Sequence, residues 1–329
     1  MTKLNLSVAF GDYDRTRALL DGSVQMEGVD PVYLVLGPEE IFFRTVVHAE
    51  FDICELSLSS FTVKTAQGDA SYIGTPVFLS RAFRHTSIYV RKDRIRAPAD
   101  LKGRKVGVAE YQLTANVWAR ALLEDEFGVK PSDIIWVRGG IEEPGRPEKI
   151  QITLSADVRL EAAPEGATLS RMLEAGEIDA FIGPRSPSCF DRGHPAIGRL
   201  FPDSVAAATD YFRRTGIFPI MHVVVVRRSL AERHPWLCVE ALKAFERAKS
   251  SALAKLGDTS ASKVTLPFAE EALLEAKALM GPDFWAYGIG PNRKVLETFL
   301  GHHHRQGLSS RLVTVEELFH PATLRMHKI

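Results

Sequence analysis

The N-terminal part of the chain alternates between short apolar strands and helices, and this alternation limits the fold more than any other feature. The predicted elements, in chain order, are residues 4–10 (strand), 14–20 (helix), 32–36 (strand), 38–48 (helix), 51–55 (strand) and 58–66 (helix). Strand–helix–strand order of this kind is typical of an α/β domain with a largely parallel sheet.

A second α/β unit is predicted from about residue 100 onward. Its elements are a helix at 114–127, strands at 134–138 and 180–182, and a helix at 168–175. The intervening residues 139–166 are rich in glycine, proline and charge, which favours a loop or hairpin. After an apolar strand at 218–226 the chain is mostly helical, with helices predicted at 235–254, 270–280 and 293–304.

This order predicts two lobes joined by two crossings, because the later strand and helices return to the first lobe. We expect lobe one at residues 1–84 and 217–329, and lobe two at residues 85–216. A length of 329 residues suits two such lobes. Ligands of α/β proteins bind at strand carboxyl ends and at domain interfaces, so a ligand cleft between the lobes is expected.

Composition narrows the partners and the compartment. The chain has 41 basic and 41 acidic residues, so bulk charge gives no case for nucleic acid or a membrane surface as partner. The three cysteines, Cys54, Cys189 and Cys238, form no CxxC pair, which argues against a disulfide framework or zinc knuckle. The first ten residues read as a strand rather than a signal peptide. A cytoplasmic location is therefore expected.

Cationic residues gather near both predicted crossings. Ser80–Val90 carries Arg81, Arg84 and His85 within a segment that otherwise predicts a strand, and Arg213 and Arg214 precede the second crossing strand. Strand interiors seldom carry charge unless a partner neutralises it. We therefore predict a site for an anion with more than one negative charge. In an ideal strand Arg81 and His85 share a face and Arg84 points away; ion pairing is the alternative for each arginine.

Titratable residues near the strand ends are candidates for acid–base chemistry. His85 and His222 lie on the predicted crossing strands, and histidine titrates near neutral pH. A buried histidine that only packs in the core is the alternative for both. Glu55 ends the third strand, where it is either a site residue or a cap for the next helix.

Further candidates follow the first strand of each lobe. Asp12 and Tyr13 come after the first strand, and a helix cap is the alternative for Asp12. Glu110 and Tyr111 come after the first strand of lobe two, and Thr114 opens a helix whose N-terminus suits a carboxylate.

Several sequence blocks resemble one enzyme family. They are Asp12–Leu19, Phe51–Ser60, Ser80–His85, Glu110–Trp118, Glu142–Lys149, Tyr211–His222 and Asp283–Gly288. Together they resemble the 4,5-dihydroxyphthalate decarboxylase family over about residues 4 to 320. Asp100–Val108 and Arg227–Trp236 resemble the corresponding segments of type II periplasmic-binding-protein folds.

The resemblance implies decarboxylation of 4,5-dihydroxyphthalate to protocatechuate by an enzyme that uses the solute-binding-protein fold. It implies a small aromatic dicarboxylate as substrate and no organic cofactor; a divalent ion and a homo-oligomer stay open. The alternatives are a non-catalytic binding protein for a dicarboxylate, and another lyase or hydrolase acting on a related aromatic acid. The predicted catalytic residues are His85, His222 and Glu55. The predicted substrate ligands are Arg81, Arg84, Arg213, Arg214, Asp12, Tyr13, Ser57, Glu110, Tyr111, Thr114 and Thr215.

Two further motifs suggest a functional role but also have an ordinary structural explanation. Three consecutive histidines, His302 to His304, suggest a metal cluster. Adjacent helical residues point in different directions, so they cannot form one facial ligand set, and no metal ligand is predicted. Trp285 and Tyr287 are expected to pack as aromatics, with a wall for the substrate ring as the other interpretation.

Overall fold

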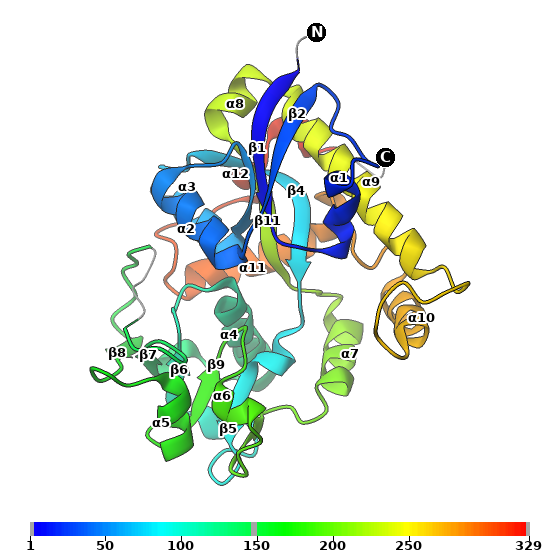
Figure 1. Cartoon of the computed structure of the whole chain (residues 1–329). Helices are drawn as coiled ribbons and strands as arrows, with labels where there is room; N and C mark the ends of the chain where they lie inside the picture. The colour runs from blue at the N-terminus through cyan, green and yellow to red at the C-terminus, as the bar shows by residue number, and fades with distance from the viewer. Residues whose placement is uncertain (1–2, 146–149, 327–329) are drawn as a thin grey trace. The chain divides into compact units, whose positions relative to one another are not determined.

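The computed structural model describes residues 3–145 and 150–326, and these divide into two units (Figure 1). Unit 1 contains the chain up to Arg81, Ile220–Glu297 and the stretch from Val313 onward. Unit 2 contains Ala82–Pro219 and Thr298–Leu312. Both crossings therefore lie within three residues of the boundaries expected from the sequence.

The C-terminal part differs from the prediction, which placed all of residues 217–329 in lobe one. Thr298–Leu312 belongs to unit 2, although Arg293–Arg305 is one helix, α11. Its side chains explain the assignment. The Phe299 ring lies 5.5 Å from that of Trp118, and the Gln306 side chain accepts a 2.8 Å bond from Arg120.

The sheet of unit 1 has five strands in the order β2-β1-β3-β11-β4. They are β2 (Val29–Val35), β1 (Leu4–Phe10), β3 (Ile53–Ser57), β11 (Ile220–Arg227) and β4 (Tyr72–Arg81). Strand β1 pairs in parallel with β2 and β3, whereas β11 runs antiparallel to both β3 and β4. The sheet is thus mixed rather than largely parallel, because the returning strand inserts in the opposite direction.

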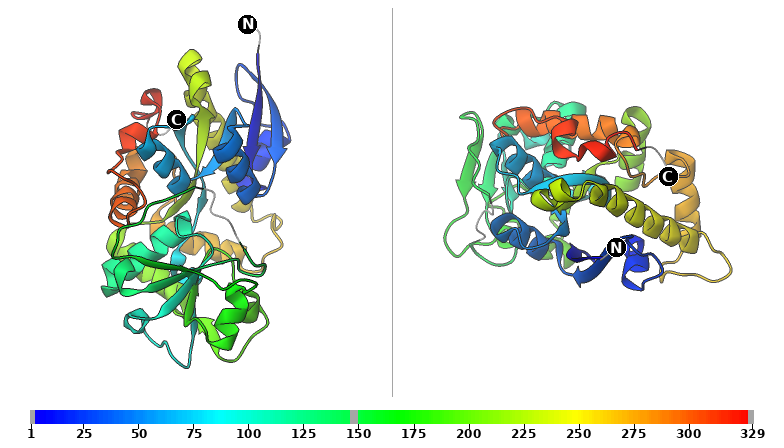
Figure 2. Two further views of the ribbon diagram at one scale, coloured as in Figure 1. Left: turned by 90° about the vertical axis from the view of Figure 1, so that its left-hand side faces the viewer. Right: turned by 90° about the horizontal axis from the view of Figure 1, so that it is seen from above.

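The helices of unit 1 follow the predicted pattern closely. They are η1 (Asp14–Thr16), α1 (Arg17–Leu20), α2 (Pro38–His48), α3 (Leu58–Gln67), α8 (Arg228–Arg233), α9 (Trp236–Leu256), α10 (Ala269–Met280), η5 (Gly290–Asn292), α12 (Val315–Leu318) and η6 (Pro321–Thr323). The long α9, yellow in Figure 2, packs on β4 and on η1 and α1, so the C-terminal half of the chain covers the N-terminal elements.

Unit 2 is built on a six-stranded sheet of order β10-β5-β9-β6-β7-β8. The strands are β10 (Ile197–Arg199), β5 (Ile88–Arg91), β9 (Ala180–Ile182), β6 (Lys105–Val108), β7 (Ile135–Arg138) and β8 (Arg159–Ala162). Its helices are η2 (Arg84–Ser87), η3 (Pro98–Leu101), α4 (Thr114–Phe127), η4 (Pro131–Asp133), α5 (Leu169–Ala175), α6 (Ser188–Asp191) and α7 (Ser204–Thr215). Strand β8 lies within the predicted loop at 139–166. Residues 146–149 of the Glu142–Lys149 block lie outside the described residues.

Of the charged residues in the two cationic segments, only Arg81 lies in a strand. Strand β4 ends at Arg81, and Arg84 and His85 lie in the 3-10 turn η2, so the strand alternation expected from Arg81 to His85 is wrong. Arg213 and Arg214 occupy the last turn of α7, and β11 begins only at Ile220. Basic residues in a last helical turn face the negative end of the helix dipole, which explains their position without a strand.

Candidate active site

Glu55 on β3 and His222 on β11 form a hydrogen-bonded pair in unit 1. In the antiparallel register His222 lies opposite Ser57, and Val224 lies opposite Glu55. Glu55 and His222 are therefore diagonal neighbours on one face, within reach of side chains of this length. The Nδ1 atom of His222 lies 2.6 Å from Oε1 of Glu55. Two of the three predicted catalytic residues thus come together.

The pairing of β11 with β4 is irregular on both sides of His222. Register shifts separate Ile220 from His222 and His222 from Val224. Bulges of this kind redirect side chains and are frequent beside active sites. The edge of the Phe42 ring from α2 packs against the imidazole, with 4.8 Å between centroids. These contacts hold the imidazole, whose side chain is 19% exposed.

Glu55 is completely buried and receives two more hydrogen bonds. The Gly11 amide donates to Oε2 at 3.0 Å, and the Tyr13 hydroxyl donates to Oε1 at 2.9 Å. Burial pushes the pKa of Glu55 upward, but the bond and charge of His222 and the bonds from Gly11 and Tyr13 lower it further than burial raises it. The carboxylate therefore stays ionised.

An ionised carboxylate can only accept hydrogen bonds, so the 2.6 Å contact fixes the proton of His222 on Nδ1. Within the described part of the chain, the other ring nitrogen, Nε2, has no hydrogen-bond partner. The pair is thus arranged so that Nε2 gains or loses a proton while Nδ1 stays bonded to Glu55. This is the arrangement of a general acid–base catalyst.

Sequence reasoning proposed Tyr13 but missed Gly11 and Phe42. The sequence did contain a signal for Gly11, because this glycine directly follows a strand that ends at the predicted site. A Cβ built on Gly11 would approach the Tyr13 ring to 2.7 Å, so only glycine fits beside this ring. No signal in the sequence marks Phe42 apart from the other apolar residues of α2.

The remaining unit 1 candidates have partners within the fold. Asp12 is exposed and lies 3.6 Å from Arg17. Ser57 accepts from the Ser60 amide at 3.3 Å as the N-cap of α3, so the helix-cap interpretation of Glu55 is wrong. Arg81 donates through Nη2 to Ala286 O at 2.8 Å and also to the Asn292 side chain. Substrate binding by Asp12, Ser57 and Arg81 stays a prediction.

His85 lies in unit 2 and has a different environment. Its ring packs against Phe83, Phe201 and Tyr211, with centroid distances of 6.4, 5.1 and 5.5 Å. Its Nδ1 is buried without a hydrogen-bond partner among the described residues. Burial lowers the pKa of His85 to about 4, so the imidazole is neutral at neutral pH. His85 is therefore a poor proton donor at neutral pH.

The cationic candidates of unit 2 differ in how they are held. Burial lowers the pKa of Arg84 to about 10, and its guanidinium lies 3.3 Å from Ser87 Oγ. Arg214 is paired with Glu126 and with Asp210, the latter at 2.9 Å. Arg213, next to it, is exposed. Their role as substrate ligands stays a prediction.

The other candidates of unit 2 have internal contacts, and all but the half-buried Thr215 are buried. Thr215 donates to Tyr211 O at 2.7 Å. Glu110 accepts from the Gln112 amide at 3.0 Å, and the Arg120 guanidinium stacks 3.8 Å from the centre of the Tyr111 ring. Thr114 opens α4 as predicted. A ligand role for Glu110, Tyr111, Thr114 and Thr215 likewise stays a prediction.

The three consecutive histidines of α11 reach three different atoms. His302 bonds Asp125 at 2.6 Å, His303 lies 3.1 Å from Ser309 Oγ, and His304 lies 3.0 Å from the Ser309 carbonyl oxygen. Over residues 3–145 and 150–326, no group of three or more His, Cys, Asp or Glu side chains is placed to hold a metal ion.

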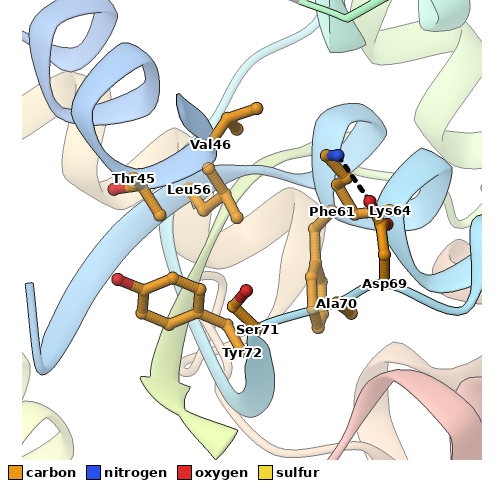
Figure 3. Close-up of a pocket in the computed structure, with 9 residues that line it drawn as sticks. All are labelled: Thr45, Val46, Leu56, Phe61, Lys64, Asp69, Ala70, Ser71 and Tyr72. Atoms are coloured by element: carbon orange, nitrogen blue, oxygen red, sulfur yellow. Dashed lines mark hydrogen bonds and ion pairs between the residues drawn. The ribbon is translucent and has the colours of Figure 1, made fainter. Parts of the chain in front are cut away.

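A separate pocket of about 180 Å³ lies in unit 1 (Figure 3). Its lining residues are Thr45, Val46, Leu56, Phe61, Lys64, Asp69, Ala70, Ser71 and Tyr72. Leu56 points to the opposite face of β3 from Glu55, because successive strand side chains alternate. The lining cation, Lys64, is already paired with Asp69 at 2.8 Å. The pocket is therefore not part of the Glu55–His222 site and offers little to an anionic ligand.

Comparison with known proteins decides the family. The chain is 59% identical over 330 residues to 4,5-dihydroxyphthalate decarboxylase of Comamonas testosteroni, and the match covers all of both chains. The chain belongs to the 4,5-dihydroxyphthalate decarboxylase family. It is also 61% identical over 214 residues to the protein of that name from Pseudomonas putida, covering 65% of this chain and 83% of the relative. No protein-family model matches the chain.

Solved structures show the fold. The periplasmic aliphatic sulphonate binding protein of Escherichia coli superposes with a TM-score of 0.54 at 15% identity, covering 100% of this chain and 96% of that one. The desulfurization enzyme DszB superposes with a TM-score of 0.52 at 17% identity and 98% coverage of both chains. The family member described here thus has a periplasmic-binding-protein-like fold, as expected from the sequence. No helix among the described residues is long and apolar enough to cross a membrane.

Proposed function

We propose that this chain is a carboxy-lyase that converts 4,5-dihydroxyphthalate to 3,4-dihydroxybenzoate (protocatechuate) and carbon dioxide, a step of phthalate degradation. The full-length identity of 59% to a decarboxylase of that name supports the reaction. The observation that carries the chemistry is the 2.6 Å contact between His222 Nδ1 and the buried Glu55 carboxylate. A binding protein needs no such proton-exchanging pair.

In the proposed mechanism His222 is the general acid. Each carboxylate of the substrate is para to a ring hydroxyl, which can push electrons toward the carbon that carries the carboxylate. The His222 imidazolium donates its Nε2 proton to that carbon, which gives a cyclohexadienyl cation that the para hydroxyl stabilises while keeping its own proton. The bond to the carboxylate then breaks, its electron pair restores the aromatic ring, and carbon dioxide leaves. His222 recovers a proton from solvent, and Glu55 stabilises the imidazolium between turnovers.

The chemistry needs no organic cofactor, and we propose none. We further propose a small aromatic dicarboxylate as the partner of this chain, with no nucleic acid or membrane, and a cytoplasmic location. The three cysteines are free and buried, which is compatible with a reducing compartment. The assembly state and a divalent ion are left to experiment.

The test is to incubate the purified protein with 4,5-dihydroxyphthalate and to follow carbon dioxide and protocatechuate, with and without a chelator. We expect stoichiometric release of both products at a rate that the chelator does not change. Loss of activity on chelation, restored by a divalent ion, would show that a metal takes part.

The same experiment distinguishes the proposed decarboxylase from the alternative functions. Calorimetric binding of 4,5-dihydroxyphthalate without product formation would contradict the enzyme and favour a non-catalytic solute-binding protein. If another hydroxylated aromatic acid gave product and 4,5-dihydroxyphthalate gave none, the chain would still be a lyase, but with a different substrate.

A further inference from the structure

The side chain of Tyr13 faces Glu55, and its hydroxyl is already used in a hydrogen bond to that carboxylate. Its hydroxyl donates to Oε1, the same oxygen that contacts Nδ1 of His222, at 2.9 and 2.6 Å respectively. The Gly11 amide holds the other oxygen. Two donors on one oxygen of a buried carboxylate leave it little freedom to rotate, and bonds to an ionised acceptor are the stronger kind.

The Tyr13 ring is fixed by a stack of its own. The Arg15 guanidinium lies 4.2 Å from the centre of the Tyr13 ring and 4.6 Å from that of Trp285, so it is sandwiched between them. Arg15 also donates through Nε to Leu79 O at 2.7 Å, and the Trp285 indole donates to Phe78 O at 2.9 Å. The middle of the stack, Arg15, and one of its ends, Trp285, are thus bonded to the backbone of β4.

The Tyr13 proton stays on its oxygen. Burial and then the charge of Glu55 raise the pKa of the Tyr13 hydroxyl well above its ordinary value. A hydroxyl that keeps its proton and already donates it to Glu55 has no second proton for a substrate. The Tyr13 hydroxyl is thus committed as a donor to Glu55, and substrate binding by Tyr13 stays a prediction.

We infer that Tyr13 is a positioning residue, which acts on His222 through Glu55 and is locked by the Arg15–Trp285 stack. The expected change in kcat rests on the proposed function. The expected change in the titration of the His222 imidazole does not depend on that function. By neutralising part of the charge on Oε1, Tyr13 limits how strongly Glu55 stabilises the imidazolium. It also keeps Oε1 aimed at Nδ1, so that Nε2 has a fixed direction.

The test compares Tyr13→Phe with Tyr33→Phe as matched control, because Tyr33 is a partly buried tyrosine of the same unit on β2, beside Phe10. We expect kcat of Tyr13→Phe to fall about 10-fold with KM within about twofold, as for residues that orient a catalytic group. We expect the alkaline limb of its pH–rate profile to move up by roughly half a unit to one unit, because the unshielded carboxylate stabilises the imidazolium more. The control should match the parent protein.

Imidazole NMR titration of the same variants, with His222→Gln to assign the signal, gives a readout without turnover. We expect the His222 midpoint to move to higher pH in Tyr13→Phe alone. A raised KM with unchanged kcat and an unchanged titration would overturn the inference and return Tyr13 to substrate binding. If the parent protein does not turn over, the proposed function fails, and the titration still decides the role of Tyr13.

Discussion

The two histidines near the crossings, His222 in unit 1 and His85 in unit 2, are the same residue type in opposite environments. His222 meets an ionised, buried carboxylate at 2.6 Å. His85 meets only the rings of Phe83, Phe201 and Tyr211, and its Nδ1 is buried without a partner among the described residues. One environment gives the imidazole a charged hydrogen-bond partner, and the other buries it among aromatic rings.

The comparison teaches that burial near a predicted site does not make a histidine an acid. The buried Glu55 carboxylate hydrogen-bonds His222 and orients its ring, whereas the described neighbours of the His85 ring are aromatic. For His85 desolvation has the largest effect, the charge of Glu126 raises the pKa and that of Arg214 lowers it, and the resulting pKa is about 4. The following experiments test this difference, beginning with the largest expected effect.

His222→Gln should lower kcat about 1,000-fold, within the usual range for loss of a general acid. His85→Gln should lower it less than about 10-fold, because a neutral imidazole donates no proton. Steady-state decarboxylation at pH 7 checks both, with His48→Gln on the exposed side of α2 as control. Comparable losses for His85 and His222 would erase the contrast between the two sites.

Glu55→Gln should lower kcat about 100-fold, the upper range for a residue that orients a catalytic group. The amide cannot stabilise an imidazolium, and its NH₂ group facing Nδ1 would favour the wrong tautomer. The exposed Glu50→Gln is the matched control. Near-normal kcat in Glu55→Gln, measured with saturating substrate, would mean that His222 works without its carboxylate.

Acid should destabilise the protein through His85. Above pH 6.5 both the folded and unfolded states hold a neutral imidazole, but between 6.5 and about 4 only the unfolded state binds the proton. The free energy of unfolding should therefore fall by about 2–3 kcal/mol from this group between pH 7 and 4.5. Denaturant unfolding at several pH values, with the parent protein and with His85→Leu, measures this contribution. It equals the difference between the two proteins in how the free energy of unfolding changes with pH. Equal pH dependence in the two proteins would refute the buried, unpaired state of His85.

Gly11→Ala should disturb the carboxylate from its other side. The new methyl group would lie 2.7 Å from the Tyr13 ring, and forcing extra atoms into packed sites costs about 1–3 kcal/mol of stability. We expect kcat to fall about 10-fold as the Tyr13 bond to Glu55 lengthens. Thermal melting and kinetics check the two effects, and Gly37→Ala, where φ is −64° and the added Cβ has no neighbour within 4 Å, controls for the loss of glycine entropy.

Arg214→Gln should have the smallest effect. Its ion pairs with Glu126 and Asp210 involve a side chain that is 51% exposed, and such pairs contribute less than about 1 kcal/mol. Urea unfolding measures the stability, and substrate saturation measures KM. A KM raised about 10-fold would instead support the substrate role predicted from the sequence.

Much of the fold follows from local sequence patterns. The spans of α2 and α4 agree with the prediction residue for residue. Pro38 with Glu39 and Glu40 marks the start of α2, and Gly128 marks the end of α4. The crossing segments were predicted less well. The segment from Ser80 to Val90 was interpreted as a strand, but Arg84 to Ser87 form a 3-10 turn. The predicted strand 218–226 begins two residues before β11, and the helix α7 that holds Arg213 and Arg214 was not predicted.

Local patterns and family resemblance were enough to predict the α/β class, the two units, the family and the residue types available for catalysis. Which of these residues work together depends on the three-dimensional packing. His222 finds Glu55 across 167 positions of sequence, through a strand register that no local pattern encodes. Hydrophobic periodicity reports which face of an element is buried and says nothing about the partner it meets there. For the same reason, only the packing of Phe299 and Gln306 assigned Thr298–Leu312 to unit 2.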